Sequence, residues 1–307
     1  MAKIFDFCRM RCNGQRHFVA TPHQSASQTA SPQGEAFETI YKKEYTLDFI
    51  DFHTHIYPDA IAHKAANNVR DFYGFGNKTI DGSVKTLLAR GDLAGTHRFV
   101  ALPVAVRPDR TRHINEFIAG AVAEQPRLFG FGTVHAGQED ITGEVDFIME
   151  KGLRGIKMHP DFQLFNIDDQ RLFPVYEQIQ DRLPVIFHVG DDRYDYSHPA
   201  RVRRIMELFP KLQVIAAHFG SYALYREAYD LLKDTDCFFD VSSSLMFMDE
   251  GVPESYINSY GAERFVYGSD FPMWDPVVEM DRFMKLKLTD DQFEQIAHKT
   301  AEYILKL

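Results

Sequence analysis

Two histidines separated by one residue, His53 and His55, are the first side chains in this sequence whose types and spacing suggest chemistry. They lie in the stretch FIDFHTHIYP (residues 49–58), whose apolar first half predicts a short buried strand. Side chains alternate along a strand, so both imidazoles are expected to face the same way, where they can share one metal ion. Such a pair alone is more typical of structural histidines, so the interpretation depends on further ligands downstream.

Further metal-binding or acid–base side chains lie within or directly after later apolar runs. The stretches GIKMHP, PVIFH, VIAAHFG and YGSDFP supply Lys157, His159, His188, His218 and Asp270. A random scatter of 13 histidines would not end two separate apolar runs in this way. The pattern therefore favours one shared site over unrelated structural roles.

The elements that must position these side chains are short apolar strands separated by amphipathic segments. The first strand begins at residue 49, and seven more are predicted at residues 97–103, 128–134, 153–158, 184–188, 212–217, 237–241 and 264–267. Helices are predicted at residues 113–125, 170–182, 200–209 and 222–233. This alternation predicts an α/β fold, a (β/α)8 TIM barrel, with a doubly wound open sheet as the alternative. A barrel would bring the carboxyl ends of all eight strands to one site.

Composition limits the kinds of partner. The chain has 307 residues, 45% of them hydrophobic, and a net charge of -10, which disfavours nucleic acid and anionic membrane surfaces. We therefore expect a small-molecule substrate, no nucleic-acid or membrane partner, and a possible homodimer. The sequence has no apolar run near the roughly 18 residues of a membrane span and no apolar segment of a secretory signal. Together with three cysteines, an odd number, this predicts a cytoplasmic protein.

The amino-terminal part differs in composition from the rest of the chain. Residues 25–37 are small and polar with proline and glycine, which is typical of a linker. We predict an amino-terminal extension and linker at residues 1–45 and one barrel domain at residues 46–307.

The stretches DFHTHIYP, GIKMHPDFQ, PVIFH, VIAAHFG and YGSDFP, in this order, resemble the amidohydrolase superfamily. The similarity is to the amidohydrolase-related branch, which includes aminocarboxymuconate-semialdehyde decarboxylase, and it covers residues 49 to about 304. It implies a TIM barrel with a divalent metal ion, usually zinc, at the carboxyl ends of the strands. By position, His53, His55, His188 and Asp270 resemble the metal ligands of that branch, and His218 resembles its water-activating histidine.

The chemistry of these residue types agrees with the resemblance. Three neutral imidazoles and one carboxylate suit zinc and leave a position for water or substrate. Asp270 is expected to act both as a ligand and as a proton acceptor. His218 is expected to handle the proton of the attacking water and to titrate near neutrality.

Lys157 leaves the number of metal ions open. In two-metal members of the superfamily, a lysine at the fourth strand is carboxylated and bridges the ions. In the branch that this chain resembles, the lysine more often accompanies one ion and faces the substrate. We expect one metal ion, with Lys157, His159, Gln163 and Arg193 binding the substrate.

Three function classes remain. The first is a metal-dependent hydrolase, in which a metal-activated water attacks an amide, lactone or ester-like bond. The alternative is a non-oxidative decarboxylase of a small carboxylic acid that uses the same site. A non-catalytic metal-binding barrel fits least, because an acid–base set beside an open metal position implies a reaction.

Overall fold

The computed structural model describes residues 48–76 and 80–307. The predicted extension at residues 1–45 lies outside the described residues, so the domain boundary stays a prediction. Within the described ranges, no helix is both long enough and apolar enough to cross a membrane.

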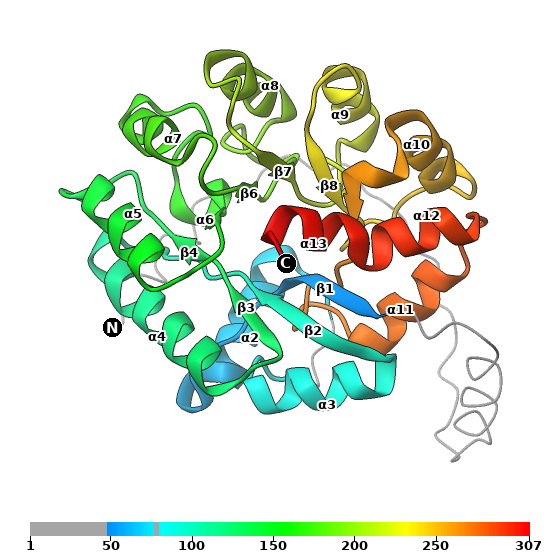
Figure 1. Cartoon of the computed structure of the whole chain (residues 1–307), viewed down its shortest axis with the longest axis horizontal. Helices are drawn as coiled ribbons and strands as arrows, with labels where there is room; N and C mark the ends of the chain where they lie inside the picture. Colours follow the sequence, from blue (N-terminus) through cyan, green and yellow to red (C-terminus); the bar gives the residue numbers. More distant parts are fainter. Residues whose placement is uncertain (1–47, 77–79) are drawn as a thin grey trace. The chain divides into compact units, whose positions relative to one another are not determined.

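Strands and helices alternate along the described chain (Figure 1). The strands are β1 Phe49–Thr54, β2 Thr96–Ala101, β3 Leu128–Gly130, β4 Gly132–Thr133, β5 Ile156–Met158, β6 Val185–Phe187, β7 Val214–Ala216, β8 Phe238–Asp240 and β9 Phe265–Val266. The α-helices are α2 Asp59–Tyr73, α3 Val84–Ala94, α4 Thr111–Glu124, α5 Ile141–Glu150, α6 Pro160–Gln163, α7 Phe173–Ile179, α8 Pro199–Leu208, α9 Tyr225–Leu232, α10 Val252–Tyr260, α11 Pro276–Met284, α12 Asp290–Glu294 and α13 Thr300–Leu305. Shorter turns of 3-10 or π-helix lie at Pro108–Arg110, Gln170–Leu172, Ala262–Arg264 and Gln295–Lys299.

All strand pairs are parallel, in the orders β1-β2-β3 and β4-β5-β6-β7-β8-β9. The predicted third strand, residues 128–134, is divided into β3 and β4. The N–H of Phe131 donates to Ala101 O of β2 at 3.0 Å, whereas the N–H of Gly132 donates to Gly155 O beside β5 at 2.8 Å. The two halves therefore join the two sheets, and the nine strands occupy eight barrel positions.

The barrel closes between β9 and β1. The N–H of Phe52 donates to Tyr267 O at 2.8 Å, and Thr54 forms a parallel bridge with Phe271. The predicted (β/α)8 barrel is confirmed, although most strands are shorter than the apolar runs that predicted them.

The core has two layers because each strand is buried on both faces. In β6, Ile186 packs with residues of the barrel interior, whereas Val185 and Phe187 belong to the layer between strands and helices. Ile304 of α13 joins the interior cluster, and Figure 1 shows α13 (red) lying across the barrel. Burial on both faces explains why the strands are continuous apolar runs, since each such side chain contributes about 1.5–3 kcal/mol when buried.

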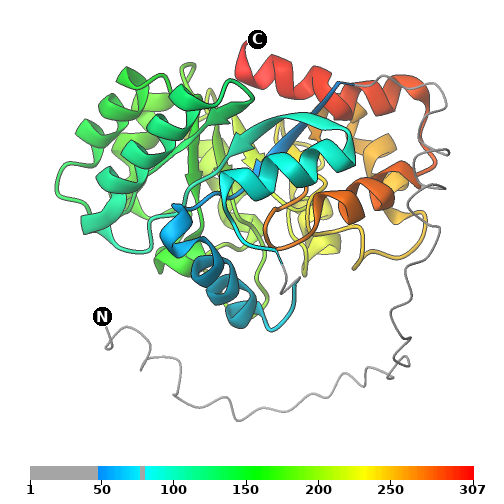
Figure 2. The same ribbon diagram turned by 90° about the horizontal axis from the view of Figure 1, so that it is seen from below.

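Helix α2 lies between β1 and β2 in the sequence and was not predicted. It begins after Pro58 and is capped by Gly74, whose positive φ of 77° suits glycine and whose N–H donates to Arg70 O at 2.7 Å. The buried Arg70 side chain donates to Pro272 O at 2.5 Å, which ties α2 to the loop after β9. In Figure 2, α2 (blue) and α13 (red) lie at opposite ends of the barrel, so α2 covers the end at which the strands finish.

Glu279 of α11 makes a testable contribution to the pH dependence of stability. Its carboxylate is buried beside Arg282, and burial raises the pKa of Glu279 to about 7. Because this pKa is higher in the folded state, the associated stability is present below about pH 4.5 and is lost as the pH rises through about 7. We expect the unfolding free energy from denaturant titration to fall over this range, and less steeply in Glu279→Gln. The exposed control Glu116→Gln should behave like the wild type; an equally steep fall in Glu279→Gln would contradict the assignment.

Candidate metal centre

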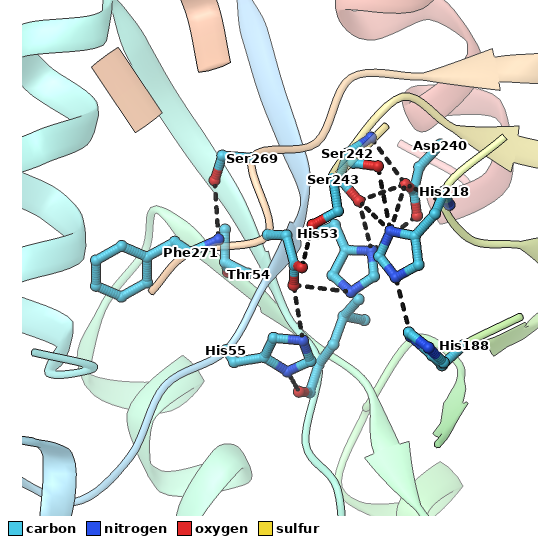
Figure 3. Close-up of polar contacts among 12 residues, drawn as sticks. His53, Thr54, His55, His188, His218, Asp240, Ser242, Ser243, Ser269 and Phe271 are labelled. Carbon is cyan, nitrogen blue, oxygen red and sulfur yellow. Dashed lines mark hydrogen bonds and ion pairs between the residues drawn. The ribbon is translucent and has the colours of Figure 1, made fainter. Parts of the chain in front are cut away.

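His53 and His55 are each held so that one ring nitrogen, Nε2, faces the carboxylate of Asp270 (Figure 3). His53 Nδ1 lies 2.7 Å from Asp240 Oδ2, and His55 Nδ1 lies 2.5 Å from Leu102 O. These acceptors keep the proton on Nδ1 and leave the lone pair on Nε2, as is usual for metal-binding histidines. Gly268 leaves room for His53, since a Cβ atom there would lie 2.8 Å from His53 Cβ.

Asp270 completes a three-residue group with these histidines. Its Oδ1 lies 3.6 Å from His53 Nε2 and 3.3 Å from His55 Nε2. Burial acts in the opposite direction, but the neighbouring side chains of His55, His53 and His218 keep the pKa of Asp270 below its ordinary value. Burial and the Lys157 ammonium lower the pKa of His53 to about 3, so its ring is neutral. Two imidazole nitrogens and a carboxylate oxygen fit a divalent ion.

Two other groups of His and Asp side chains suit a metal less well. His159, Asp161 and His188 are close together, but the two histidine rings are stacked at 3.9 Å with an angle of 8° between them. His53 and His218, which are grouped with Asp240, are stacked at 5.0 Å and 23°. Lone pairs in parallel, stacked rings do not converge on one ion. His53 and His55 are inclined at 67°, which allows convergence.

Asp240 is a residue of the centre that sequence analysis missed. Besides His53, it accepts the N–H of His218 at 3.1 Å and the hydroxyl of Ser242 at 2.5 Å. These bonds, with the nearby imidazoles, hold the pKa of Asp240 below its ordinary value despite complete burial. A signal was present, because Asp240 is the one charged residue of the apolar strand predicted at residues 237–241.

His188 and His218 contact each other, and His218 is also stacked on His53. His188 Nδ1 lies 3.0 Å from His218 Nε2, and His218 Nδ1 lies 2.9 Å from Ser242 Oγ. The predicted fourth ligand, His188, therefore needs a ring rotation to reach the group formed by His53, His55 and Asp270. The assignments of His188 as a ligand and of His218 as a catalyst stay predictions.

Strained backbone marks three strand ends at the centre. His218, Ser243 and Asp270 have φ values of 62°, 50° and 57°, in the left-handed region that residues with side chains rarely adopt. Each follows a different strand, respectively β7, β8 and β9. Strain of this kind costs about 1–3 kcal/mol per residue and is typical of functional sites.

Lys157 of β5 is completely buried inside the barrel, with Nζ 3.3 Å from His53 Nε2. Burial lowers the pKa of Lys157 to about 8, so most of it is still an ammonium at neutral pH. The amine is also partly available in its neutral form, which carboxylation would require. The structure brings Lys157 together with His53, and its chemical role stays a prediction.

Two predicted substrate-binding residues have structural partners. Gln163 Nε2 donates to Ala105 O and Val134 O, both at 2.9 Å, while its Oε1 accepts the N–H of His159. Arg193 forms a two-bond ion pair with Asp191, at 2.8 and 2.6 Å. These contacts give both side chains positioning roles, and their contact with substrate stays untested.

Aromatic side chains from several loops gather beside the metal group. Phe75, after α2, is stacked on Trp274, after β9, at 5.9 Å and 15°. The ring of Phe247, after β8, lies 5.6 Å from that of Phe75. The ring of Tyr222, after β7, lies 6.1 Å from that of Phe247. Trp274 Nε1 donates to Ser243 Oγ, which in turn donates to the carboxylate of Asp270. A polar metal centre therefore adjoins an aromatic wall.

The fold and this site define a TIM barrel with a metal centre at the carboxyl ends of its strands. The profile of the amidohydrolase family (Amidohydro_2) matches residues 50–307, and the chain belongs to this family. The resemblance in the sequence motifs is thereby confirmed. Among curated proteins, none matches the chain.

Solved structures with the same fold are distant in sequence. An uncharacterised TIM-barrel protein of Bordetella bronchiseptica has a TM-score of 0.71 and 20% identity, over 85% of this chain and 99% of that chain. 5-Carboxyvanillate decarboxylase of Sphingomonas paucimobilis has a TM-score of 0.68 and 16% identity, over 85% and 99%. Dihydroxybenzoic acid decarboxylase of Polaromonas sp. JS666, solved with manganese and 2-nitroresorcinol, has a TM-score of 0.65 and 17% identity, over 85% of this chain and 97% of that chain.

Proposed function

We propose that this enzyme is a metal-dependent decarboxylase that releases carbon dioxide from a small aromatic carboxylic acid. The observation that carries the proposal is Lys157, a buried cation 3.3 Å from the metal-facing nitrogen of His53. Among the described residues its hydrogen-bond partner is this neutral ring, which leaves the ammonium charge available to a substrate carboxylate. The similarity to two decarboxylases of aromatic acids supports the same reaction.

The aromatic wall supports the choice of an aromatic acid. Phe75, Trp274 and Phe247 offer flat apolar surface beside Asp270, and planar rings pack well on such surfaces. A substrate with its ring against this wall and its carboxylate toward Lys157 would match both halves of the site.

The proposed ligands are His53, His55, Asp270 and, after rotation, His188. The bound divalent ion would supply positive charge that attracts substrate oxygens and stabilises negative charge as the carbon–carbon bond breaks. We propose zinc from the ligand types, with manganese as the alternative because the Polaromonas enzyme contains it.

The chain's own residues would carry out the remaining steps. Lys157 orients the carboxylate, and the bond between this carboxylate and the ring breaks so that carbon dioxide leaves and the electron pair stays on the ring carbon. The protonated form of His218 delivers a proton to that carbon and returns to the neutral ring, which gives the decarboxylated product. Asp240 holds His218 through the backbone N–H at 3.1 Å.

Hydrolysis of an amide, lactone or ester-like bond is the second candidate. Membership of the amidohydrolase family favours it. In that reaction, His218 would take a proton from the attacking water instead of giving one to carbon.

The proposal also covers location and partners. We propose that the protein is cytoplasmic, forms a homodimer and acts on a free small-molecule substrate, without nucleic-acid or membrane partners.

Product analysis separates the two reactions. Metal-loaded protein should release carbon dioxide from at least one member of a panel of hydroxybenzoic acids, and Lys157→Met should reduce this release about a hundredfold or more while keeping its metal. Lactones and amides serve as the comparison panel. Water-addition products without carbon dioxide would overturn the decarboxylase proposal and favour the hydrolase.

A further inference from the structure

Tyr73, the last residue of α2, brings a hydroxyl group to the stacked histidines beside the metal centre. Its oxygen lies 2.9 Å from His159 Nε2 and 3.3 Å from His188 Nε2. A tyrosine hydroxyl keeps its proton near neutral pH, since its ordinary pKa is about 10. A protonated hydroxyl between two ring nitrogens accepts from one and donates to the other.

The surrounding hydrogen bonds decide the direction of this chain. The backbone N–H of Phe162 donates to His159 Nδ1 at 3.4 Å, so the proton of the neutral His159 ring belongs on Nε2. His159 therefore donates to Tyr73, and Tyr73 donates to His188 Nε2. The proton of His188 is then on Nδ1, from which it is donated to His218 Nε2 at 3.0 Å.

His188 consequently has its only lone pair on the nitrogen that Tyr73 occupies. A neutral imidazole binds a metal through its unprotonated nitrogen, here Nε2. If His188 is the fourth ligand, this nitrogen must exchange the Tyr73 hydroxyl for the ion. His55, by contrast, has its protonated Nδ1 on Leu102 O and its Nε2 directed toward Asp270. The Nε2 of His53 also faces Asp270 and lies 3.3 Å from Lys157 Nζ.

We propose that Tyr73 is a positioning residue of the metal centre, whose hydroxyl competes with the divalent ion for His188 Nε2. The inference rests on the proposed function, since it takes His188 as a metal ligand. Once exchanged, the hydroxyl remains beside the ion with His159 as its partner, at a place where it can bind substrate.

Arg193 holds Tyr73 in this place. Its Nη1 donates to Phe72 O at 2.8 Å, and its guanidinium carbon lies 5.2 Å from the centre of the Tyr73 ring. The ion pair with Asp191 fixes Arg193 to the loop that begins at His188. The loop that begins at His188 therefore also anchors the end of α2. This role accounts for the contacts of Arg193 with Phe72 and Asp191.

Metal affinity tests the inference without any substrate. Protein stripped with a chelator is titrated with Zn2+ or Mn2+ against a chromophoric competitor. Tyr73→Phe should bind the ion about two- to tenfold more tightly than the wild type, the scale of one neutral hydrogen bond that no longer has to be broken. Tyr222→Phe, which removes a hydroxyl from a ring 5.9 Å from His188, is the matched control and should stay at wild-type affinity.

The outcomes are distinguishable from a failure of the proposed function. A purely structural role for Tyr73 would leave affinity unchanged or weaken it, and either result overturns the inference. If His53→Ala weakens binding while Tyr73→Phe matches the wild type, the metal centre stands and only the role of Tyr73 is wrong. If the wild type binds no divalent ion, both proposals fail. Melting temperatures of both variants confirm that they are folded.

Discussion

Replacing His53 and His55 together by alanine is expected to remove the divalent ion from the purified protein. Both Nε2 atoms face Asp270 Oδ1, at 3.6 and 3.3 Å, so the double variant keeps one of these three donors. Loss of a hydrogen-bond partner of a metal ligand typically costs about 10- to 100-fold in affinity, and loss of two ligands should cost far more. Elemental analysis of wild-type protein should give about one equivalent, and that of the double variant close to none.

The matched control is His97→Ala together with His113→Ala, since both of these histidines are exposed. This double variant should keep the wild-type metal content. Unchanged metal content in His53→Ala/His55→Ala would show that the assignment is wrong. Two equivalents in the wild type, both lost in Lys157→Met, would instead indicate the bridged two-metal site.

Removal of the His218 side chain is expected to separate catalysis from metal binding. His218 contacts His188 and Ser242, whereas Asp270 faces His53 and His55. His218→Ala should therefore keep nearly full metal occupancy while turnover falls about a hundredfold or more, the usual scale for a lost general acid or base. Asp270→Ala should lose both metal and turnover, because Asp270 is proposed as ligand and acid–base group.

Metal content and rate must be measured on the same samples for this comparison. His113→Ala, an exposed substitution on α4, serves as the control for both measurements. If His218→Ala loses metal in proportion to its activity, His218 is a ligand, and the centre resembles that of the two-metal members of the superfamily.

The surroundings of His218 lower the pH at which its ring is expected to titrate, compared with the value near neutrality that the sequence suggested. Burial lowers the pKa of His218, and a nearby divalent ion would lower it further. Its effect on a pH–rate profile should therefore appear below the ordinary histidine value of about 6.5.

Sequence motifs predicted the barrel and several residues of its site for a physical reason. Each barrel strand is buried on both faces, so it appears as an apolar run, and a polar residue at its end is conspicuous. His53, His55 and Asp270 follow this rule, and they meet around one point in the structure. Lys157 also follows it, and its ammonium reaches His53 Nε2.

The rule fails where a side chain reaches the site from another kind of element. Tyr73 belongs to the amphipathic helix α2, whose apolar residues are equally consistent with ordinary packing. Gln163 is the last residue of the short helix α6, and its amide donates to the backbone carbonyls of Ala105 and Val134 in two neighbouring loops. Position along the chain does not reveal such directions, because they depend on which backbone groups are left without partners after the barrel closes.

The amino-acid sequence by itself determined the alternation of buried strands with helices, and with it the barrel and the end of the barrel where chemistry can occur. Only the tertiary structure decided which nitrogen of each histidine is available. Asp240 and Leu102 O keep the lone pairs of His53 and His55 on Nε2, which faces Asp270, while Tyr73 occupies Nε2 of His188. The reason is that a tautomer depends on hydrogen-bond partners, and the partners named for these three histidines lie 47 to 187 positions away in the sequence.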